Sequence, residues 1–275
     1  MRTSQHIGNG MKAVAATLLG FVVVFPIYYT VAASFFSLHE FSMFPPRLFP
    51  TSFSPIHYIR AITESPLLRF MGNSLVVSGV GTIIRMAVAI LAAFAVAFFD
   101  FKGKRVLFFL IIGTMMLPPD ALIIENYLTV SRFGLVDSYL GIMSVYLLGP
   151  VQLFMLRQSF KTIPRTYREI ASIDGCSDLS FLFAVVLPLS RPVVLALSLH
   201  SFVTLWNTYL WPLLVTNAPQ MRTVQVGITL LGYVDSLDFG PIFAAITLMI
   251  MPSILLLLVL RKKIVAGIQS GIMVG

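Results

Sequence analysis

The chain has 275 residues, of which 57% are hydrophobic and only 11% are charged. Soluble domains carry about 25% charged residues, so this composition excludes an ordinary water-soluble fold and indicates a membrane protein. The single cysteine, Cys176, excludes an internal disulfide framework, and no group of cysteines and histidines has the spacing of zinc ligands.

Six apolar runs are candidates for membrane-spanning helices. The first, residues 13–36, would form a helix of about 36 Å at about 1.5 Å per residue, enough to cross a hydrocarbon core of about 30 Å. A cleaved signal peptide is the alternative, but its apolar region would end after about 7–15 residues. The other runs lie at residues 71–98, 106–130, 138–156, 188–215 and 240–260. We therefore predict an all-α integral membrane protein with six transmembrane helices.

The basic residues orient these helices. Thirteen of the 19 Lys and Arg residues fall on one side of the predicted membrane and five on the other, while Arg85 lies within a span. The positive-inside rule therefore places both termini in the cytoplasm. The same alternation accounts for the net charge of +8, and it disfavours nucleic acid as a partner, because a nucleic-acid site would cluster basic and aromatic residues together.

This topology predicts how the chain is organised. Its segments are a cytoplasmic N-terminus (1–12), the first transmembrane helix (13–36), an extracytoplasmic loop (37–69), a five-helix core (70–262) and a cytoplasmic C-terminal tail (263–275). The loop 37–69 holds five prolines, too many for a regular element, so we expect an ordered cap. Pro118-Pro119 breaks the third span and frees backbone carbonyls, which indicates either a translocation path or an ordinary kink.

Ionisable residues inside spans are costly and tend to face the interior of a helix bundle. Asp120 directly follows the proline break, where a carboxylate would cap a new half-helix. Glu125 is open to three interpretations: a salt bridge to Arg85, a hydrogen bond to a polar solute, or a position near the outer interface. His200 is a lone histidine, for which a helix–helix hydrogen bond is expected.

The longest cytoplasmic connection, residues 157–191, reads as structured. Pro164 suits the first position of a helix, and Tyr167, Ile170 and Ile173 place apolar groups largely on one side of it. Asp174-Gly175 predicts a helix stop, and Ser177 or Asp178 predicts the N-cap of a second short helix that leads to Pro188. A corner fixed by glycine favours docking of a partner over a loop that merely lies in the lipid interface.

At these residues the chain resembles the maltose-type inner-membrane permeases of binding-protein-dependent ABC importers. The EAA loop of that family, here residues 157–188, has Glu-Ala-Ala, three further residues and Gly, followed by an Ile-x-Leu-Pro-like ending. The matching segments of this chain are Glu169-Ile170-Ala171-Ser172-Ile173-Asp174-Gly175 and Val186-Leu187-Pro188-Leu189. Ile170 stands where the family has its first alanine.

The resemblance extends over residues 70–275. Further family-like segments follow in family order: Met116-Leu117-Pro118, Gly134-Leu135-Val136-Asp137-Ser138-Tyr139, Phe160-Lys161-Thr162-Ile163-Pro164 and Trp206-Asn207-Thr208-Tyr209-Leu210-Trp211-Pro212. The ending, residues 263–275, looks like the glycine-rich tail of the smaller permease subunit. In that case Gly267, Gly271 and Gly275 would contact the ATPase pair.

The resemblance implies a set of partners and a mechanism. A homologous second permease would complete a heterodimeric pore, two ATPase subunits would bind ATP and Mg, and an extracytoplasmic solute-binding protein would deliver the cargo. By this resemblance the contact with an ATPase cleft would be made by Tyr167, Glu169, Ile170, Ala171, Ile173, Asp174 and Gly175. It further implies alternating access, a bacterial or archaeal cytoplasmic membrane with its lipid around the chain, and a sugar, oligosaccharide, polyol or glycerol phosphodiester as cargo.

The residues themselves predict no catalysis in this chain. The sequence has no Gly-x-x-x-x-Gly-Lys-Ser/Thr loop to hold nucleotide phosphates, so we expect no cofactor here and place ATP hydrolysis on a partner. It also has no histidine pair at i, i+4 and no Gly-x-Ser-x-Gly, so neither a metal site nor a hydrolase is predicted.

Polar and aromatic residues in the spans are candidates for the path of a small polar solute. They are Asp120, Glu125, Asn126, Tyr127, Asn207 and Tyr209. Trp206 and Trp211 would either anchor in the membrane interface or stack on a sugar. An ion-gradient-driven secondary transporter is the alternative function, with Arg85, Asp120 and Glu125 as its coupling groups.

Overall fold

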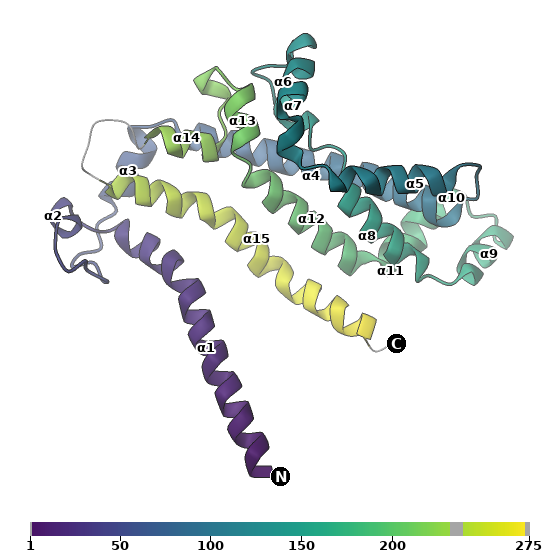
Figure 1. Cartoon of the computed structure of the whole chain (residues 1–275), viewed down its shortest axis with the longest axis horizontal. Coiled ribbons are helices and arrows are strands. Elements are labelled where there is room, and N and C mark those ends of the chain that lie inside the picture. Colours follow the sequence, from purple (N-terminus) through teal and green to yellow (C-terminus); the bar gives the residue numbers. More distant parts are fainter. Residues whose placement is uncertain (1, 232–238, 273–275) are drawn as a thin grey trace. The chain divides into compact units, whose positions relative to one another are not determined.

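The computed structural model describes the backbone of residues 2–231 and 239–272, and the side chains of residues 12–118, 121–230 and 239–261. Every regular element in these ranges is a helix, as the apolar runs predicted. The chain divides into two compact units, Met1–Leu68 with Gly227–Met251 and Arg69–Val226 with Pro252–Gly275 (Figure 1). We call them unit 1 and unit 2.

Unit 1 is built around the end of one long helix. Its elements are α1 (Arg2–Ala33), α2 (Leu38–Phe41), α3 (Ile56–Thr63), the end of α14 (Val224–Leu231) and the beginning of α15 (Gly240–Ile272). Ala32, Ala33 and Phe36 form a small buried core at the C-terminal end of α1. The Phe41 ring stacks on Phe243, with ring centroids 5.7 Å apart, so α2 is fixed against α15.

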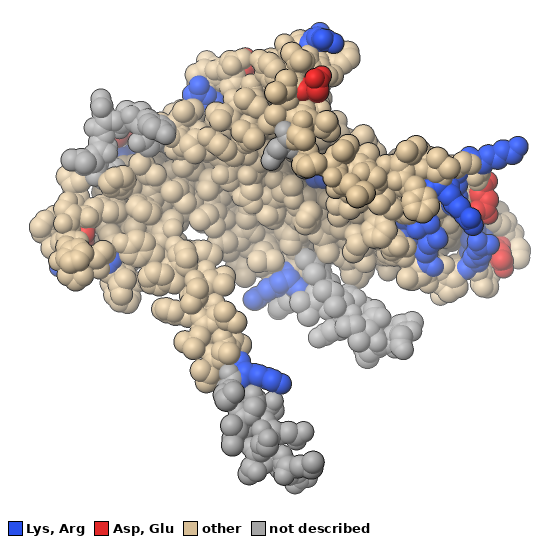
Figure 2. All heavy atoms as spheres, in the orientation of Figure 1, with Lys and Arg blue, Asp and Glu red and all other residues tan. Residues whose placement is uncertain are grey.

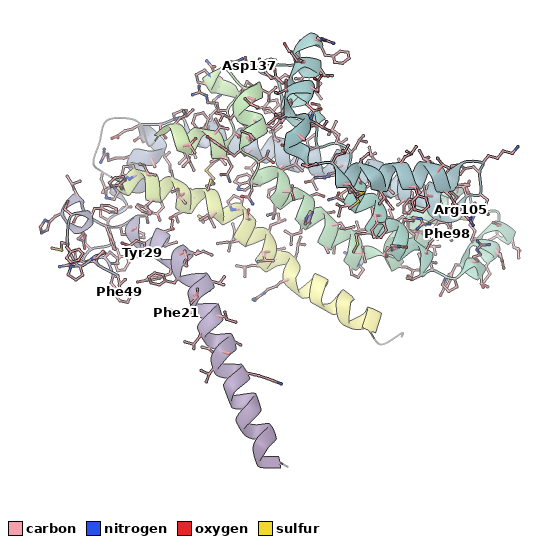
Figure 3. The ribbon with its side chains drawn as sticks, viewed as in Figure 1. Phe21, Tyr29, Phe49, Phe98, Arg105 and Asp137 are labelled. Atoms are coloured by element: carbon pink, nitrogen blue, oxygen red, sulfur yellow. The ribbon has the colours of Figure 1, made fainter. Side chains whose placement is uncertain are left out.

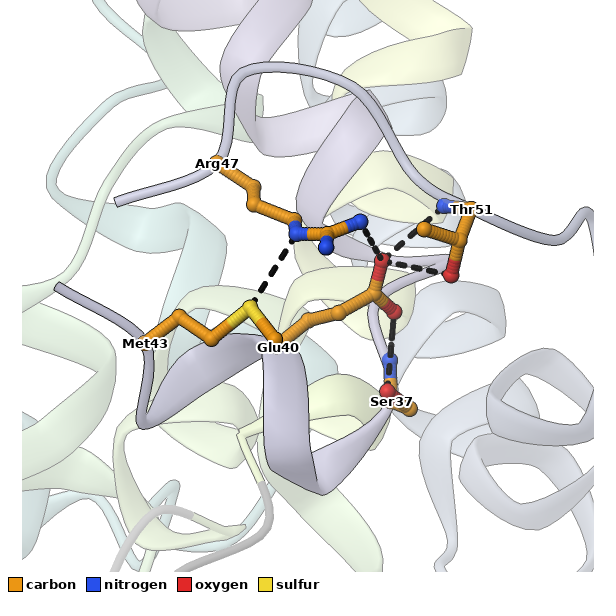
Figure 4. Close-up of polar contacts among 5 residues, drawn as sticks. All are labelled: Ser37, Glu40, Met43, Arg47 and Thr51. Atoms are coloured by element: carbon orange, nitrogen blue, oxygen red, sulfur yellow. Dashed lines mark hydrogen bonds and ion pairs between the residues drawn. The ribbon is translucent and has the colours of Figure 1, made fainter. Parts of the chain in front are cut away.

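Glu40 organises the proline-rich segment between α1 and α3. Its buried carboxylate accepts four hydrogen bonds of 2.8–2.9 Å from the amides and hydroxyls of Ser37 and Thr51 (Figure 4). The guanidinium of Arg47 lies 3.9 Å from the same carboxylate and donates to the sulfur of Met43. Burial raises the pKa of Glu40, but the hydrogen bonds outweigh it and lower the pKa from 4.5 to about 2. One ionised carboxylate thus holds together a segment with little regular structure of its own.

The same segment is more regular than its prolines predicted. The short helices α2 and α3 fit between the prolines, and α4 begins at Leu67, inside the loop expected to reach residue 69. None of these helices contains a proline, so no hydrogen bond inside them is lost for want of an amide donor.

Unit 2 contains most of the helices. They are α4 (Leu67–Phe98), α5 (Lys104–Gly113), η1 (Thr114–Met116), η2 (Pro119–Leu122), α6 (Ile123–Arg132), α7 (Tyr139–Ser144), α8 (Pro150–Lys161), α9 (Arg165–Ile173), α10 (Asp178–Phe181), the π-helical turn η3 (Leu182–Val186), α11 (Leu187–Leu189), α12 (Arg191–Trp206), α13 (Leu210–Val215) and η4 (Pro219–Met221). Its larger core is aromatic and includes the buried Phe94, Phe160 and Phe181. This core lies under α9 and α10, so it is what fixes the predicted docking element in place.

Within the described part of the chain, three helical segments are long and apolar enough to cross a membrane: Lys12–Ala33, Leu67–Phe98 and Gly240–Arg261. A fourth span results if Asp178–Leu189 and Arg191–Trp206, which meet at 84°, are counted as one broken span. The runs expected at 106–130, 138–156 and 188–215 are interrupted near Pro118, between α7 and α8, and between α12 and α13. Apolar composition identified these segments, but the breaks within them depend on packing that periodicity does not reveal.

We predict that replacing the Glu40 carboxylate by an amide loosens this segment. In Glu40→Gln one carboxylate oxygen becomes an NH₂ group, which cannot accept the hydrogen bonds that Ser37 or Thr51 donates. The local stability at neutral pH should therefore fall by roughly 1–3 kcal/mol. In the wild type the contribution of Glu40 should be present above pH ~4.5 and be lost as the pH falls toward ~2, because the unfolded carboxyl takes up a proton before the folded one. Hydrogen exchange at the Thr51 amide measures both effects.

Glu64→Gln is the matched control, because its carboxylate is exposed on α3. Equal Thr51 exchange in wild type and Glu40→Gln at neutral pH would contradict the role of Glu40.

Candidate functional site

The helix predicted to dock a partner is present and carries an exposed apolar ridge. Pro164 occupies the N-cap position of α9, one residue before the first helical position expected for it. Tyr167, Ile170 and Ile173 are 48%, 54% and 84% exposed. Their spacing of three residues places them on one side of the helix, so a large apolar surface faces away from the rest of unit 2. We call these three residues the α9 ridge.

Gly175 ends α9 with the conformation that its sequence predicted. Its φ of +72° lies in the left-handed region. The Cys176 amide donates to the Ala171 carbonyl (2.8 Å), and the Gly175 amide donates to the Ser172 carbonyl (3.2 Å). These two bonds form a Schellman motif, and Ala171 and Cys176 both pack on the aromatic core. The helix stop is therefore confirmed, and it sets the direction of the α9 ridge.

Arg168 ties α9 to the next helix, a role that sequence reasoning missed. Its guanidinium forms an ion pair with Asp178 and lies 5.2 Å from the centre of the Phe181 ring. Ser177 caps α10 by accepting from the Ser180 amide, as one of the two predicted N-caps. The i, i+10 spacing of Arg168 and Asp178 becomes meaningful only once Gly175 has turned the chain, so the sequence pattern could not reveal it.

Positive charge gathers beside α9. Figure 2 shows Lys and Arg side chains concentrated at the end of unit 2 that holds α9 and α10, and Figure 3 places Phe98 and Arg105 at the same end. A hollow of about 420 Å³ there is lined by residues of α4, α8 and α9, including Lys161, Arg165 and Glu169, and by Asp100 just after α4. Arg157 is the main cause of a lowered pKa for Lys161, with burial, Lys104 and Arg165 adding to it. The cations therefore crowd one another, and the carboxylates of Asp100 and Glu169 line the same hollow.

The candidate pathway residues fall on two neighbouring elements of unit 2. Glu125, Asn126 and Tyr127 lie on α6, while Asn207 and Tyr209 lie at the junction of α12 with α13, which packs against α6. Asn207 is exposed and accepts a hydrogen bond from Gln225 (3.2 Å). These groups are thus brought to one region, but no hydrogen bond among the described residues joins the two sets.

Two predicted site features lie outside the described residues. The side chain of Asp120 on η2 is one of them, so its interpretation as a cap stays a prediction. Gly267 and Gly271 belong to the helical backbone of α15, whereas Gly275 lies beyond it.

The salt bridge considered between Glu125 and Arg85 does not form. Glu125 is exposed on α6, and no ion pair involves either residue among the described residues. The guanidinium atoms Nε and Nη1 of Arg85 are shielded from solvent without a hydrogen-bond partner. Spacing along the sequence could not decide this question, because it depends on the direction in which α6 leaves the proline break.

Both tryptophans are buried, which corrects the two alternatives considered for them. Trp206 is 1% and Trp211 3% exposed, so neither forms an interfacial belt or offers a face to a sugar. The Trp211 indole instead donates to the carbonyls of Gly141 and Ile142, each at 3.2 Å. Trp211 therefore fixes α13 to α7.

Asp137 and Tyr139, in the family-like segment of residues 134–139, connect neighbouring elements of unit 2 through hydrogen bonds. Asp137 adopts a positive φ of 59°, donates its amide to Val215 (2.9 Å) and accepts from the Ala218 amide (2.7 Å). The Tyr139 hydroxyl donates to the buried Asn73, whose amide nitrogen donates to two carbonyls near η4. This segment is thus a polar lock that joins α4, α7 and the segment after α13.

Comparison with known proteins agrees with this architecture. Residues 85–270 match the family described as binding-protein-dependent transport system inner membrane component. The sn-glycerol-3-phosphate transport system permease protein UgpE of Agrobacterium fabrum is 32% identical, over 91% of this chain and 93% of that protein. This chain belongs to the family of inner-membrane permease components of binding-protein-dependent transport systems. The ion-gradient-driven alternative is therefore not supported.

Other related permeases are named for different transported compounds. The sulfoquinovosyl glycerol transport system permease protein SmoH of Agrobacterium fabrum is 29% identical over 98% of this chain and 95% of its own length. The arabinooligosaccharides transport system permease protein AraQ of Halalkalibacterium halodurans is 25% identical over 98% of both chains. A chain of a bacterial ABC transporter that imports the acidic polysaccharide alginate has the same fold, with a TM-score of 0.84 and 23% identity over 94% of this chain and 97% of that one.

We predict that substitutions of Gly175 destabilise the turn between α9 and α10. The effect should be larger for residues that adopt a left-handed φ less readily. No atom lies within 4 Å of the site of a Cβ at Gly175, so the cost is conformational, about 1–2 kcal/mol for an L-residue. The maleimide labelling rate of Cys176, the only cysteine, should rise about tenfold in Gly175→Val and less in Gly175→Asn, because asparagine tolerates this conformation.

Membrane insertion should be unchanged in all of these variants, since none alters a span. Equal labelling rates in wild type and Gly175→Val would show that the left-handed corner does not hold α9.

Proposed function

We propose that this chain is one of the two permease subunits that form the translocation pore of an ABC importer, and that α9 couples it to an ATPase subunit. The observation that carries the proposal is the α9 ridge, an exposed apolar surface on a helix whose exit is fixed by a Schellman motif. An isolated apolar surface of this kind needs a partner, because water does not solvate it favourably. A cleft in an ATPase is the partner that the family provides.

The proposal includes a topology of six spans with both termini in the cytoplasm. The broken segments α5–α6, α7–α8 and α10–α12 supply the three spans that are not continuous helices. The basic surface around Lys161 and Arg165 would then face the cytoplasm, as the positive-inside rule requires. In this topology the chain is a multi-pass protein of the bacterial cytoplasmic membrane, and the segment held by Glu40 faces outward toward a solute-binding protein.

The division of labour in the complex follows from the same proposal. Two ATPase subunits would bind ATP and Mg and close on them, and a homologous second permease would complete the pore. Closure would move α9 through the α9 ridge, and the rigid packing of Ala171 and Phe181 on the aromatic core would pass this movement into unit 2. The tail with Gly267, Gly271 and Gly275 is proposed as a second contact with the ATPase pair.

We propose a sugar or related polar solute as cargo, in line with the names of the relatives. Those names include a glycerol phosphate, a sulfoquinovosyl glycerol and an arabinooligosaccharide. All three compounds carry several hydroxyl groups, which suits a path with Asn126, Tyr127, Asn207 and Tyr209 as hydrogen-bonding groups.

Reconstituted uptake tests the proposed function. The chain, its partner permease, two ATPase subunits and the binding protein are placed in vesicles, with sn-glycerol 3-phosphate and arabinotriose as probes. Uptake of at least one probe should require ATP and the binding protein, and it should survive an ionophore that collapses ion gradients. Uptake that is lost with the ionophore but persists without ATP would overturn the proposal.

The α9 ridge should be essential for coupling. Ile170→Asp places a charge in the proposed apolar contact, so ATPase binding and uptake should both fall about tenfold or more. Ser172→Asp is the matched control, because it adds the same charge at an exposed position on another side of α9. Equal behaviour of the two variants would remove the α9 ridge from the coupling surface.

A further inference from the structure

An arginine without a partner lies deep in the longest apolar helix of unit 2. Arg85 is thirteen residues before the end of α4 at Phe98, which corresponds to roughly 20 Å along the helix axis. This distance exceeds the reach of an arginine side chain, so the guanidinium cannot extend to a lipid headgroup at that end. Its Nε and Nη1 are shielded and unpaired within the described part of the chain, while the side chain as a whole is partly exposed.

The polar side chains near Arg85 come from three helices, α4, α8 and α12. Gln152 of α8 is fully buried, and its amide nitrogen donates to the Ser201 hydroxyl of α12 at 2.9 Å. The Ser201 hydroxyl also contacts the sulfur of Met86, next to Arg85, at 4.0 Å. These contacts fix Gln152, yet its carbonyl oxygen Oε1 has no partner among the described residues.

The backbone at Gly149 lies against both of these groups. The point where a Cβ would stand at Gly149 is 2.4 Å from Gln152 Oε1 and 2.8 Å from Arg85 Nε. Any side chain there would displace one or both groups. The site thus combines cationic donors and one neutral acceptor that are unpaired among the described residues, where no carboxylate forms an ion pair with Arg85. A ring nitrogen of His200 lies 3.5 Å from the Gln152 amide nitrogen, and Tyr146 interacts electrostatically with Arg85.

We infer that this site binds a hydroxyl-bearing anion during transport, with Arg85 taking the anionic group and Gln152 Oε1 accepting from a hydroxyl. A guanidinium matches the geometry of carboxylate, sulfonate and phosphate oxygens, and a buried unpaired charge is costly without such a ligand. The inference rests on the proposed function and narrows its cargo to acidic sugars or acidic polyol derivatives. Neutral sugars would leave the guanidinium unpaired.

The substitution Gln152→Glu separates a ligand site from a structural one. It places a carboxylate of nearly the same shape beside Arg85, and the Ser201 hydroxyl, which accepts from Gln152 in the wild type, can donate to this carboxylate. If Arg85 binds cargo, this internal carboxylate should occupy it and reduce uptake of sn-glycerol 3-phosphate about tenfold or more, without loss of thermal stability. If Arg85 is structural, the variant should be at least as stable as wild type and transport normally.

Charge removal provides the second arm of the test. Arg85→Gln should reduce uptake of sn-glycerol 3-phosphate about tenfold or more, and Arg85→Lys should keep part of it. Arg132→Gln removes the same charge from an exposed position at the end of α6 and should behave as wild type. Mass spectrometry of the ligand that co-purifies with the binding protein should find an acidic compound, which replaces sn-glycerol 3-phosphate as the probe if that is not transported.

Several results would overturn this inference while the proposed function stands. They are a neutral ligand on the binding protein and wild-type uptake of the anion by Arg85→Gln. Equal loss of anionic and neutral probes in Arg85→Gln would assign Arg85 to assembly of the pore. Absence of ATP-dependent uptake with any probe would instead count against the proposed function.

Discussion

A hydrocarbon environment offers no water to an amide or carbonyl, so each interruption of a membrane helix must be satisfied by the protein itself. The break between α11 and α12 shows how this is done. Ser190 is buried there, its amide donates to Val186, its carbonyl accepts from Val194, and its hydroxyl bonds to Ser159. The polar lock around Asp137 has the same purpose between α7 and the segment after α13. Short helices in unit 2 are therefore tied to each other by side chains, and this gives α9 a firm base.

Much of the fold and of the docking element could be predicted because local rules govern them. Apolar run length identified the candidate spans at 13–36, 71–98 and 240–260, and Gly175 predicted the end of α9 because glycine adopts a left-handed φ at the least cost. The exposed spacing of Tyr167, Ile170 and Ile173 followed from helical periodicity. These features depend on neighbours within a few residues, which the sequence displays directly.

Other features depend on contacts between distant residues and could not be predicted. The burial of Trp211 depends on α7, and the ionised state of Glu40 depends on Ser37 and also on Thr51, which is eleven residues away along the chain. Arg85 and Glu125 have charges that suggested a pair, yet the helix breaks direct them apart. The same long-range packing places Arg85 beside Gln152, and we propose that the two residues together bind an anionic solute.

The central claim is that the α9 ridge sits in an ATPase subunit, and site-specific cross-linking tests it most directly. In a Cys176→Ser background the chain has no cysteine, so Ile173→Cys or Ser172→Cys places one thiol on the ridge or on another side of α9. We expect a short thiol-to-amine cross-linker to join Ile173→Cys to the ATPase subunit in the assembled complex, with far less product from Ser172→Cys. Equal cross-linking from both positions, or none from Ile173→Cys in a complex that still transports, would contradict this account.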